Sequence, residues 1–211
     1  MKSSDFRRER EQRRRTYYRE GILHAAERAI LRKGYSATTM DDVAREARLS
    51  KATIYKYIPG KGALLYEILS HYFDELRNKM ETIASGAGTA ADKLRQAIRL
   101  ALMESESKRS LTRVLWMDKS MLKLMRVFVA ASGKPASATA ADRKMIGLLR
   151  DKRNEITRVG ARILEEGVAA GEFQPMDTGR AAEFLEAVLE GYTHARFWRG
   201  DSPASKDAAD E

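Results

Sequence analysis

Cysteine is absent from this chain of 211 residues. Without thiols the protein forms no disulfide bond, no thiolate metal site and no cysteine nucleophile. Histidine is almost as scarce, because only His24, His71 and His194 occur, in three different segments. None of them stands at metal-ligand spacing from a second ligand, so we expect no metal site.

Sequence patterns that carry enzymatic chemistry are also missing. The chain has no phosphate-binding glycine loop and no nucleophile elbow, and Gly60–Gly62 is too short for a nucleotide loop. Acidic pairs such as Glu165 and Glu166 are adjacent in sequence, so their carboxylates diverge on a helix and are poor acid–base pairs. We therefore expect no catalytic residue, no cofactor and no enzymatic activity.

Long apolar runs are the third absence. No run approaches the ~18 residues that a membrane span requires. The first residues, MKSSDFRRERE, lack the apolar core of a signal peptide. These absences predict a cytoplasmic protein with no membrane partner. With 211 residues, the chain is long enough to bury a sizeable core in one large domain or two small ones.

What the chain does contain is positive charge, concentrated near its N-terminus. The net charge is +9. Residues 1–65 hold 16 Lys and Arg against 8 Asp and Glu, whereas the remaining 146 residues hold 23 against 22. This asymmetry predicts a polyanionic partner for the N-terminal part only.

Apolar residues recur at spacings of three and four along most of the chain, and no segment alternates as a strand does. The predicted fold class is therefore all-α. One short helix is expected directly after Thr39, which can cap it. Loops such as SGAGT and SGKPASATA separate later helices. The other expected helices span residues 16–33, 51–57, 61–84, 90 onward, 110–131, 141–170 and 178–198.

The stretch Thr38–Lys61 predicts two short helices joined by a tight turn. Thr39 and Asp42 fit a capping box at the first helix, and Ser50 can cap the second, Lys51–Tyr57. Two helices joined in this way form a helix-turn-helix, whose second helix can enter the major groove of DNA. A plain helical hairpin with a solvated charged face is the alternative that this pattern leaves open.

Side chains of the second helix are expected to divide into two sets. Ala52 and Ile54 are predicted to face the core. The residues predicted to point outward are Lys51, Thr53, Tyr55, Lys56 and Tyr57.

Two longer segments contain the stretch Thr38–Lys61, apart from Arg48, and the residues around it. They read ILHAAERAILRKGYSATTMDDVAREA, from Ile22, and LSKATIYKYIPGKGALL, ending at Leu65. Both resemble the DNA-binding domain of the TetR/AcrR (tetracycline-repressor-like) family of bacterial transcription regulators. The resemblance implies a three-helix helix-turn-helix domain, a connecting helix and a helical ligand-binding and dimerisation domain, about nine helices in all. It also implies a repressor that binds a palindromic operator in double-stranded DNA as a homodimer and is released by a small molecule.

The chain departs from the family pattern at four positions. Arg48 stands in the turn where the family usually has glycine. If that backbone is left-handed, arginine costs roughly 1–2 kcal/mol there. Ile58 stands where the family favours phenylalanine, and Lys56 stands where the family often has an aromatic residue. Gly60 replaces the usual serine cap.

The DNA-contacting residues follow from the resemblance. Lys51, Thr53 and Tyr55 are expected at or near base edges, and Thr39, Tyr57 and Lys61 at phosphates. The full set predicted to bind DNA is Thr38, Thr39, Arg48, Ser50, Lys51, Thr53, Tyr55, Lys56, Tyr57 and Lys61.

A pocket and an interface are expected in the second half. Methionine and aromatic residues make adaptable apolar walls for a ligand pocket, and an apolar or aromatic effector is expected there. The alternative is that these residues form an ordinary hydrophobic core. The predicted pocket residues are Phe73, Met103, Trp116, Met117, Met121, Met125 and Phe128. The dimer interface predicted on the last two helices contains Ile156, Ile163, Leu185, Val188, Leu189 and Tyr192.

The predicted layout is a disordered basic arm (1–15), a helix-turn-helix domain (16–65), a sensing and dimerisation domain (66–199) and a disordered tail (200–211). The arm is either an ordinary solvated run or a DNA-contacting segment, as homeodomain arms are. Two other functions stay open: a ligand-independent architectural or interaction protein of the same fold, and an enzyme or carrier with a vestigial DNA-binding domain.

Overall fold

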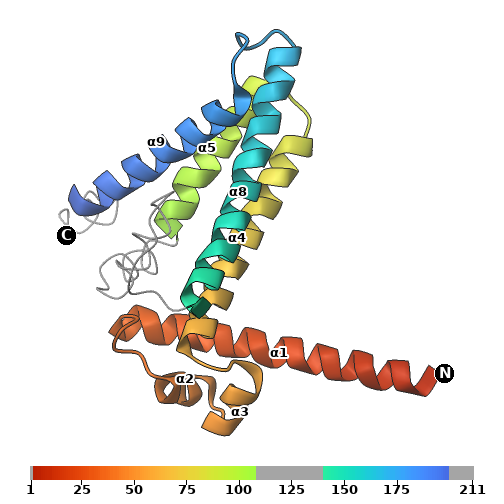
Figure 1. The fold of residues 1–211 in the computed structure, drawn as a ribbon, viewed down its shortest axis with the longest axis vertical. Helices are drawn as coiled ribbons and strands as arrows, with labels where there is room; N and C mark the ends of the chain where they lie inside the picture. The colour runs from red at the N-terminus through yellow and green to blue at the C-terminus, as the bar shows by residue number, and fades with distance from the viewer. Residues whose placement is uncertain (1, 108–139, 200–211) are drawn as a thin grey trace, which may run out of the picture. The chain divides into compact units, whose positions relative to one another are not determined.

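The computed structural model describes residues 2–107 and 140–199, which form seven α-helices and no strand (Figure 1). The all-α prediction is confirmed for this part of the chain. The helix expected over residues 110–131 and the tail expected over 200–211 lie outside the described residues, so the total of about nine helices stays a prediction. The helices are α1 (Lys2–Lys33), α2 (Met40–Ala47), α3 (Lys51–Tyr57), α4 (Lys61–Ser85), α5 (Ala90–Ser107), α8 (Ala140–Ala169) and α9 (Thr178–Arg199).

Helix α1 differs most from expectation. It begins at Lys2, so the prediction of a disordered arm is wrong for residues 2–15. Arginine, glutamate and glutamine are good helix formers, and they dominate this segment. Ion pairs one turn apart add support, with Arg13 2.6 Å from Glu9 and Arg14 2.8 Å from Glu11. The result is a 32-residue helix of which only the C-terminal half belongs to the expected domain.

The chain divides into two compact units. Of the described residues, the first unit contains 2–72 and 140–149, and the second contains 73–107 and 150–199. Helix α4 runs through the boundary between Tyr72 and Phe73 and also through the boundary predicted after residue 65.

One apolar core holds the first unit together. Helix α1 contributes a face that shows the three-and-four spacing of an amphipathic helix. The short helices α2 and α3, too short to be stable alone, are fixed by packing on it. The buried members are Ile22, Ala26, Ile30, Tyr35, Met40, Val43, Ala44, Ile54, Tyr57, Ile58, Leu64, Leu65 and Ile68.

The second unit has its own core, centred on Met80, Ala97, Val159 and Ile163. The loop before α9 closes one end of this unit, because the Glu172 carboxylate accepts the N–H groups of Ala90 and Ala91 at 3.2 and 2.9 Å, which caps α5. None of the helices in the described residues combines the length and the apolar composition needed to cross a membrane.

Candidate nucleic-acid interface

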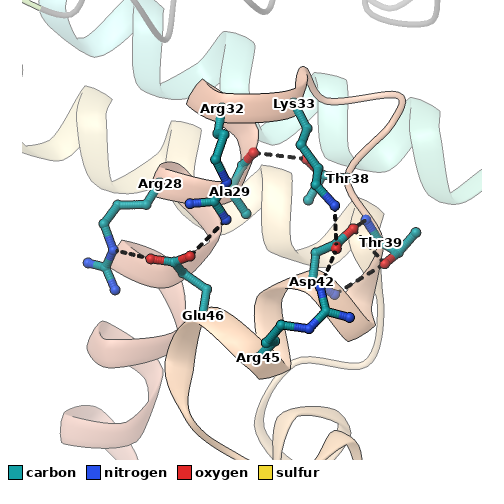
Figure 2. Close-up of polar contacts among 9 residues, drawn as sticks. All are labelled: Arg28, Ala29, Arg32, Lys33, Thr38, Thr39, Asp42, Arg45 and Glu46. Carbon is teal, nitrogen blue, oxygen red and sulfur yellow. Dashed lines mark hydrogen bonds and ion pairs between the residues drawn. The ribbon is translucent and has the colours of Figure 1, made fainter.

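The start of α2 is fixed by the capping box that the sequence predicts. The backbone N–H of Asp42 donates to Thr39 Oγ1 at 3.1 Å, and the N–H of Thr39 donates to Asp42 Oδ2 at 3.0 Å (Figure 2). Each residue thereby satisfies an N–H group that the helix leaves unpaired. Thr39 itself remains exposed at this helix end.

Ion pairs tie α2 to α1 on either side of this cap. Lys33 donates to Asp42 Oδ1 at 2.6 Å, while Arg28 and Arg32 each donate to Glu46 at 2.8 Å (Figure 2). The hydrogen bond from Lys33, helped by the N–H of Thr39, holds the pKa of Asp42 well below its ordinary range. Hydrogen bonds from Arg28 and then Arg32 likewise lower the pKa of Glu46.

Acid should therefore weaken this unit through Asp42. A carboxyl whose folded-state pKa is depressed stabilises the fold above the unfolded-state value of about 3.9, and this stabilisation is lost as pH falls through the folded-state pKa. The unfolding midpoint of the wild type should fall progressively as the pH drops below about 4, and that of Asp42→Asn should fall less while starting lower at pH 7. The measurement is thermal unfolding followed by circular dichroism. Asp41→Asn, at an exposed neighbour, is the control that should keep the wild-type acid profile; a wild-type profile in Asp42→Asn would contradict this role.

The turn after α2 is left-handed at Arg48, with φ 56° and ψ 39°. The N–H of Leu49 donates to the carbonyl of Ala44 at 3.0 Å, and the N–H of Arg48 donates to that of Arg45 at 3.2 Å. These two bonds form a Schellman motif, in which glycine usually occupies the left-handed position. Among the described residues, Arg48 is the one non-glycine residue with positive φ.

Arg48→Gly should raise the free energy of unfolding by about 1 kcal/mol, because glycine removes the left-handed strain. Glycine also increases the conformational entropy of the unfolded chain, which offsets part of this stabilisation. Arg48→Ala, which removes the same charge but keeps Cβ, should give no such gain. Chemical denaturation of both variants checks this. A glycine variant no more stable than the alanine variant would show that the turn carries no strain.

Helix α3 turns Ile54 and Tyr57 inward, and both are buried, as is Ile58, which caps the C-terminal end of the helix. The Ser50 side chain caps the helix by accepting the N–H of Thr53 at 3.1 Å. The Tyr57 ring stacks on Tyr18 of α1 with 5.2 Å between ring centroids and 17° between planes. The prediction that the Tyr57 ring points outward is therefore wrong, while the phosphate contact predicted for its hydroxyl stays a prediction.

The outward face of α3 carries Lys51, Ala52, Tyr55 and Lys56, all exposed. Ala52 was expected in the core, so that expectation is wrong. Tyr55 is 44% exposed, and Thr53 is half-buried, with its hydroxyl 2.8 Å from that of Ser50. This surface joins two cations and a phenol on a helix, as groove recognition requires.

Two cations near α3 have partners within the protein. Lys51 lies 2.8 Å from Asp41 of α2, and their hydrogen bond raises the pKa of the Lys51 ammonium. Lys61 donates to the Ser36 carbonyl at 3.0 Å, and its ammonium lies 4.4 Å from the Tyr35 ring centroid. Both side chains must leave these partners before they can contact DNA.

Thr38 does not belong to the interface. It is 2% exposed, and its hydroxyl donates toward the carbonyl oxygens of Gly34 and Ala29 at 2.7 and 3.3 Å (Figure 2 draws the bond to Ala29). The hydroxyl thus completes the C-terminal end of α1, whose last carbonyls lack helical partners. The prediction that Thr38 contacts DNA is wrong.

The sensing and dimer residues are only partly described. Five of the seven pocket residues lie outside the described part of the chain: Trp116, Met117, Met121, Met125 and Phe128. Phe73 is half-buried and Met103 is exposed. Within the described residues no cluster of three His, Asp or Glu side chains could hold a metal ion.

The predicted dimer residues do not share one environment. Ile163 is fully buried in the second core, so its assignment to an interface is wrong. Ile156, Leu185 and Leu189 are half-buried. Val188 and Tyr192 are exposed, together with Phe184, which the sequence prediction missed although it stands four residues before Val188.

Comparison with known proteins gives a matching family for the N-terminal region. Residues 22–68 match the model for bacterial regulatory proteins of the tetR family. The chain is 33% identical over 81 residues to the uncharacterized HTH-type transcriptional regulator YuxN of Bacillus subtilis, a match covering 38% of this chain. It spans only 26% of the length of YuxN.

Two longer similarities extend beyond that region. The chain is 22% identical over 190 residues to the HTH-type transcriptional repressor KstR2 of Mycolicibacterium smegmatis, covering 90% of this chain and 83% of KstR2. The solved structure of the transcriptional regulator FadR from Bacillus subtilis, in complex with stearoyl-CoA, is similar with a TM-score of 0.65 at 17% identity, covering 87% of this chain and 89% of that one. At this identity the similarity shows a common fold.

Proposed function

We propose that this chain, which belongs to the tetR family of bacterial regulatory proteins through residues 22–68, regulates transcription by binding double-stranded DNA with α3 in the major groove. The observation that carries the proposal is the outward face of α3, where Lys51, Tyr55 and Lys56 are exposed while Ile54 and Tyr57 anchor the helix. A helix anchored in this way keeps its outward face in place for base edges, although Lys51 must leave Asp41 to reach them. A role in transcription places the protein in the cytoplasm, with the DNA.

The protein acts as a homodimer in this proposal, through the exposed stripe of α9. Phe184, Val188 and Tyr192 are 68%, 49% and 51% exposed and share one face at a spacing of four. Elsewhere on the helix Ala182 is buried and Leu185 and Leu189 are half-buried. A helix that is apolar around most of its circumference needs packing partners on both sides. A second copy supplies the missing partner and doubles the DNA contact, so that a palindrome is read.

Light scattering at micromolar concentration should accordingly give twice the chain mass of 23.8 kDa. Phe184→Glu combined with Val188→Glu should give the monomer mass, because two carboxylates would be buried without partners. Met176→Glu, at an exposed methionine in the loop before α9, is the control that should stay dimeric. A monomeric wild type would contradict the interface.

We also propose a small-molecule effector. A small apolar molecule would release DNA by binding better to a state in which the two recognition helices no longer stand about 34–36 Å apart. Long-chain acyl compounds are the first class to test, since the similarly folded FadR was solved with stearoyl-CoA.

The experiment that tests the proposal is selection of bound DNA from a random pool. A palindrome with half-sites one duplex turn apart is expected. Recovery of unselected sequence after repeated rounds would contradict a sequence-reading regulator.

A further inference from the structure

The first four turns of α1 carry unneutralised positive charge. Arg7, Arg8, Arg10 and Arg15 are exposed and make no ion pair with any described residue. Farther along the same helix, the basic residues are paired: Arg19 with Glu67, Arg28 and Arg32 with Glu46, and Lys33 with Asp42. The arginines of α1 without an ion-pair partner among the described residues therefore all lie in the segment that precedes the family-matching residues 22–68.

Part of this charge points to the same side as the helix-turn-helix. Arg8, Arg15, Ile22 and Ala29 are spaced seven residues apart, a spacing that drifts only ~20° per repeat around a straight helix. Ile22 and Ala29 are fully buried, and Ile22 belongs to the core that α1 shares with α2, α3 and the start of α4. Arg8 and Arg15 continue that face beyond the core, where no described residue covers them.

The segment also reaches past α3. The stacking of Tyr18 on Tyr57 marks where α1 passes the end of α3, and α1 continues beyond it (Figure 1). At 1.5 Å per residue, Arg8 lies ~15 Å farther along the helix axis than Tyr18. Because the segment is a helix about 10 Å across, it cannot enter a minor groove about 6 Å wide as an extended arm does.

We infer that the N-terminal extension of α1 is a second DNA-binding surface, in which Arg8 and Arg15 contact backbone phosphates flanking the sequence that α3 reads. This inference rests on the proposed function, and it adds a sequence-independent contact to it. Each phosphate contact releases counterions, so it adds about 0.9 to the magnitude of the slope of log affinity against log salt. The extension thus strengthens binding on any flanking sequence.

The test compares Arg8→Gln/Arg15→Gln with the wild type by fluorescence anisotropy between 50 and 300 mM salt. Two duplexes are used, one containing the selected sequence alone and one with ten further base pairs on each side. Glutamine keeps the helix, which circular dichroism verifies. The matched control is Arg99→Gln/Arg158→Gln, which removes two exposed arginines that make no ion pair with a described residue of the second unit.

The expected result is that the wild type binds the flanked duplex about tenfold or more tightly than the short one near 0.1 M salt, and that only the α1 variant fails to show this gain. The magnitude of its slope on the flanked duplex should fall by about 0.9 for each phosphate that the variant no longer neutralises. Wild-type affinity and slope in the α1 variant on both duplexes would overturn the inference while leaving the proposed function intact. Failure of the wild type to bind either duplex would overturn the proposed function itself.

Discussion

Tyr55→Ala should weaken binding to the selected DNA by about one to two orders of magnitude while leaving binding to random DNA almost unchanged. The phenol is 44% exposed on the outward face of α3, so its loss leaves the core intact. A base-edge contact discriminates by about 1–3 kcal/mol, and each 1.4 kcal/mol is a factor of ten. Anisotropy titrations of the variant against both duplexes, at one fixed salt concentration, measure the effect.

Lys56→Ala is the matched comparison, because Lys56 is an exposed neighbour whose charge suits phosphate. It should weaken selected and random DNA by the same factor and reduce the salt slope. If Tyr55→Ala also weakens both duplexes equally, Tyr55 does not read sequence and the assignment of the outward face fails.

Tyr57→Ala should destabilise the helix-turn-helix by about 3 kcal/mol or more, the usual cost of deleting a buried aromatic ring. The ring is buried and stacked on Tyr18, so its removal leaves a cavity between α1 and α3. This loss is a large fraction of the 5–15 kcal/mol by which domains are usually stable. Chemical denaturation followed by circular dichroism gives the value.

Tyr57→Phe separates packing from a phosphate contact. It keeps the ring and removes only the hydroxyl, so stability and DNA affinity should both stay near wild type. The opposite pattern, with Tyr57→Ala as stable as wild type and Tyr57→Phe defective in DNA binding, would restore the role that the sequence alone predicted for this residue.

Features set by neighbouring residues could be predicted from the sequence. The capping box of Thr39 and Asp42, the Ser50 cap and the bounds of α3 depend on hydrogen bonds that span three or four residues. The resemblance also located Arg48 where glycine is usual but left the shape of the turn open, and the backbone is left-handed there.

Features set by distant partners could not be predicted in the same way. In a helix of seven residues the period is hard to fix, and Ala52 and Ile54, two positions apart, do not share a face. The side chains that face the core are those of Ile54, Tyr57 and Ile58. They pack against residues far away in sequence, such as Tyr18. Thr38 was misassigned because its hydroxyl serves the end of the preceding helix.

At the N-terminus, the scarcity of apolar residues suggested disorder, whereas Arg, Glu and Gln favour the helix that this segment forms. Ile163 shows the opposite difficulty in the second unit. Periodicity identifies an apolar face but does not distinguish a core from an interface. The exposure in the structure separates buried Ile163 from exposed Val188 and Tyr192.

If α3 reads DNA sequence, the protein must prefer one duplex over another of equal charge, and the ratio of the two affinities measures this preference. The wild-type protein is titrated against the duplex recovered by selection and against a duplex of the same length and composition in scrambled order, both at about 0.15 M salt. Binding at least ~10³-fold tighter to the selected duplex is predicted, as for specific DNA-binding proteins in general. Equal affinity for the two duplexes would contradict the account, because charge alone would then explain the binding.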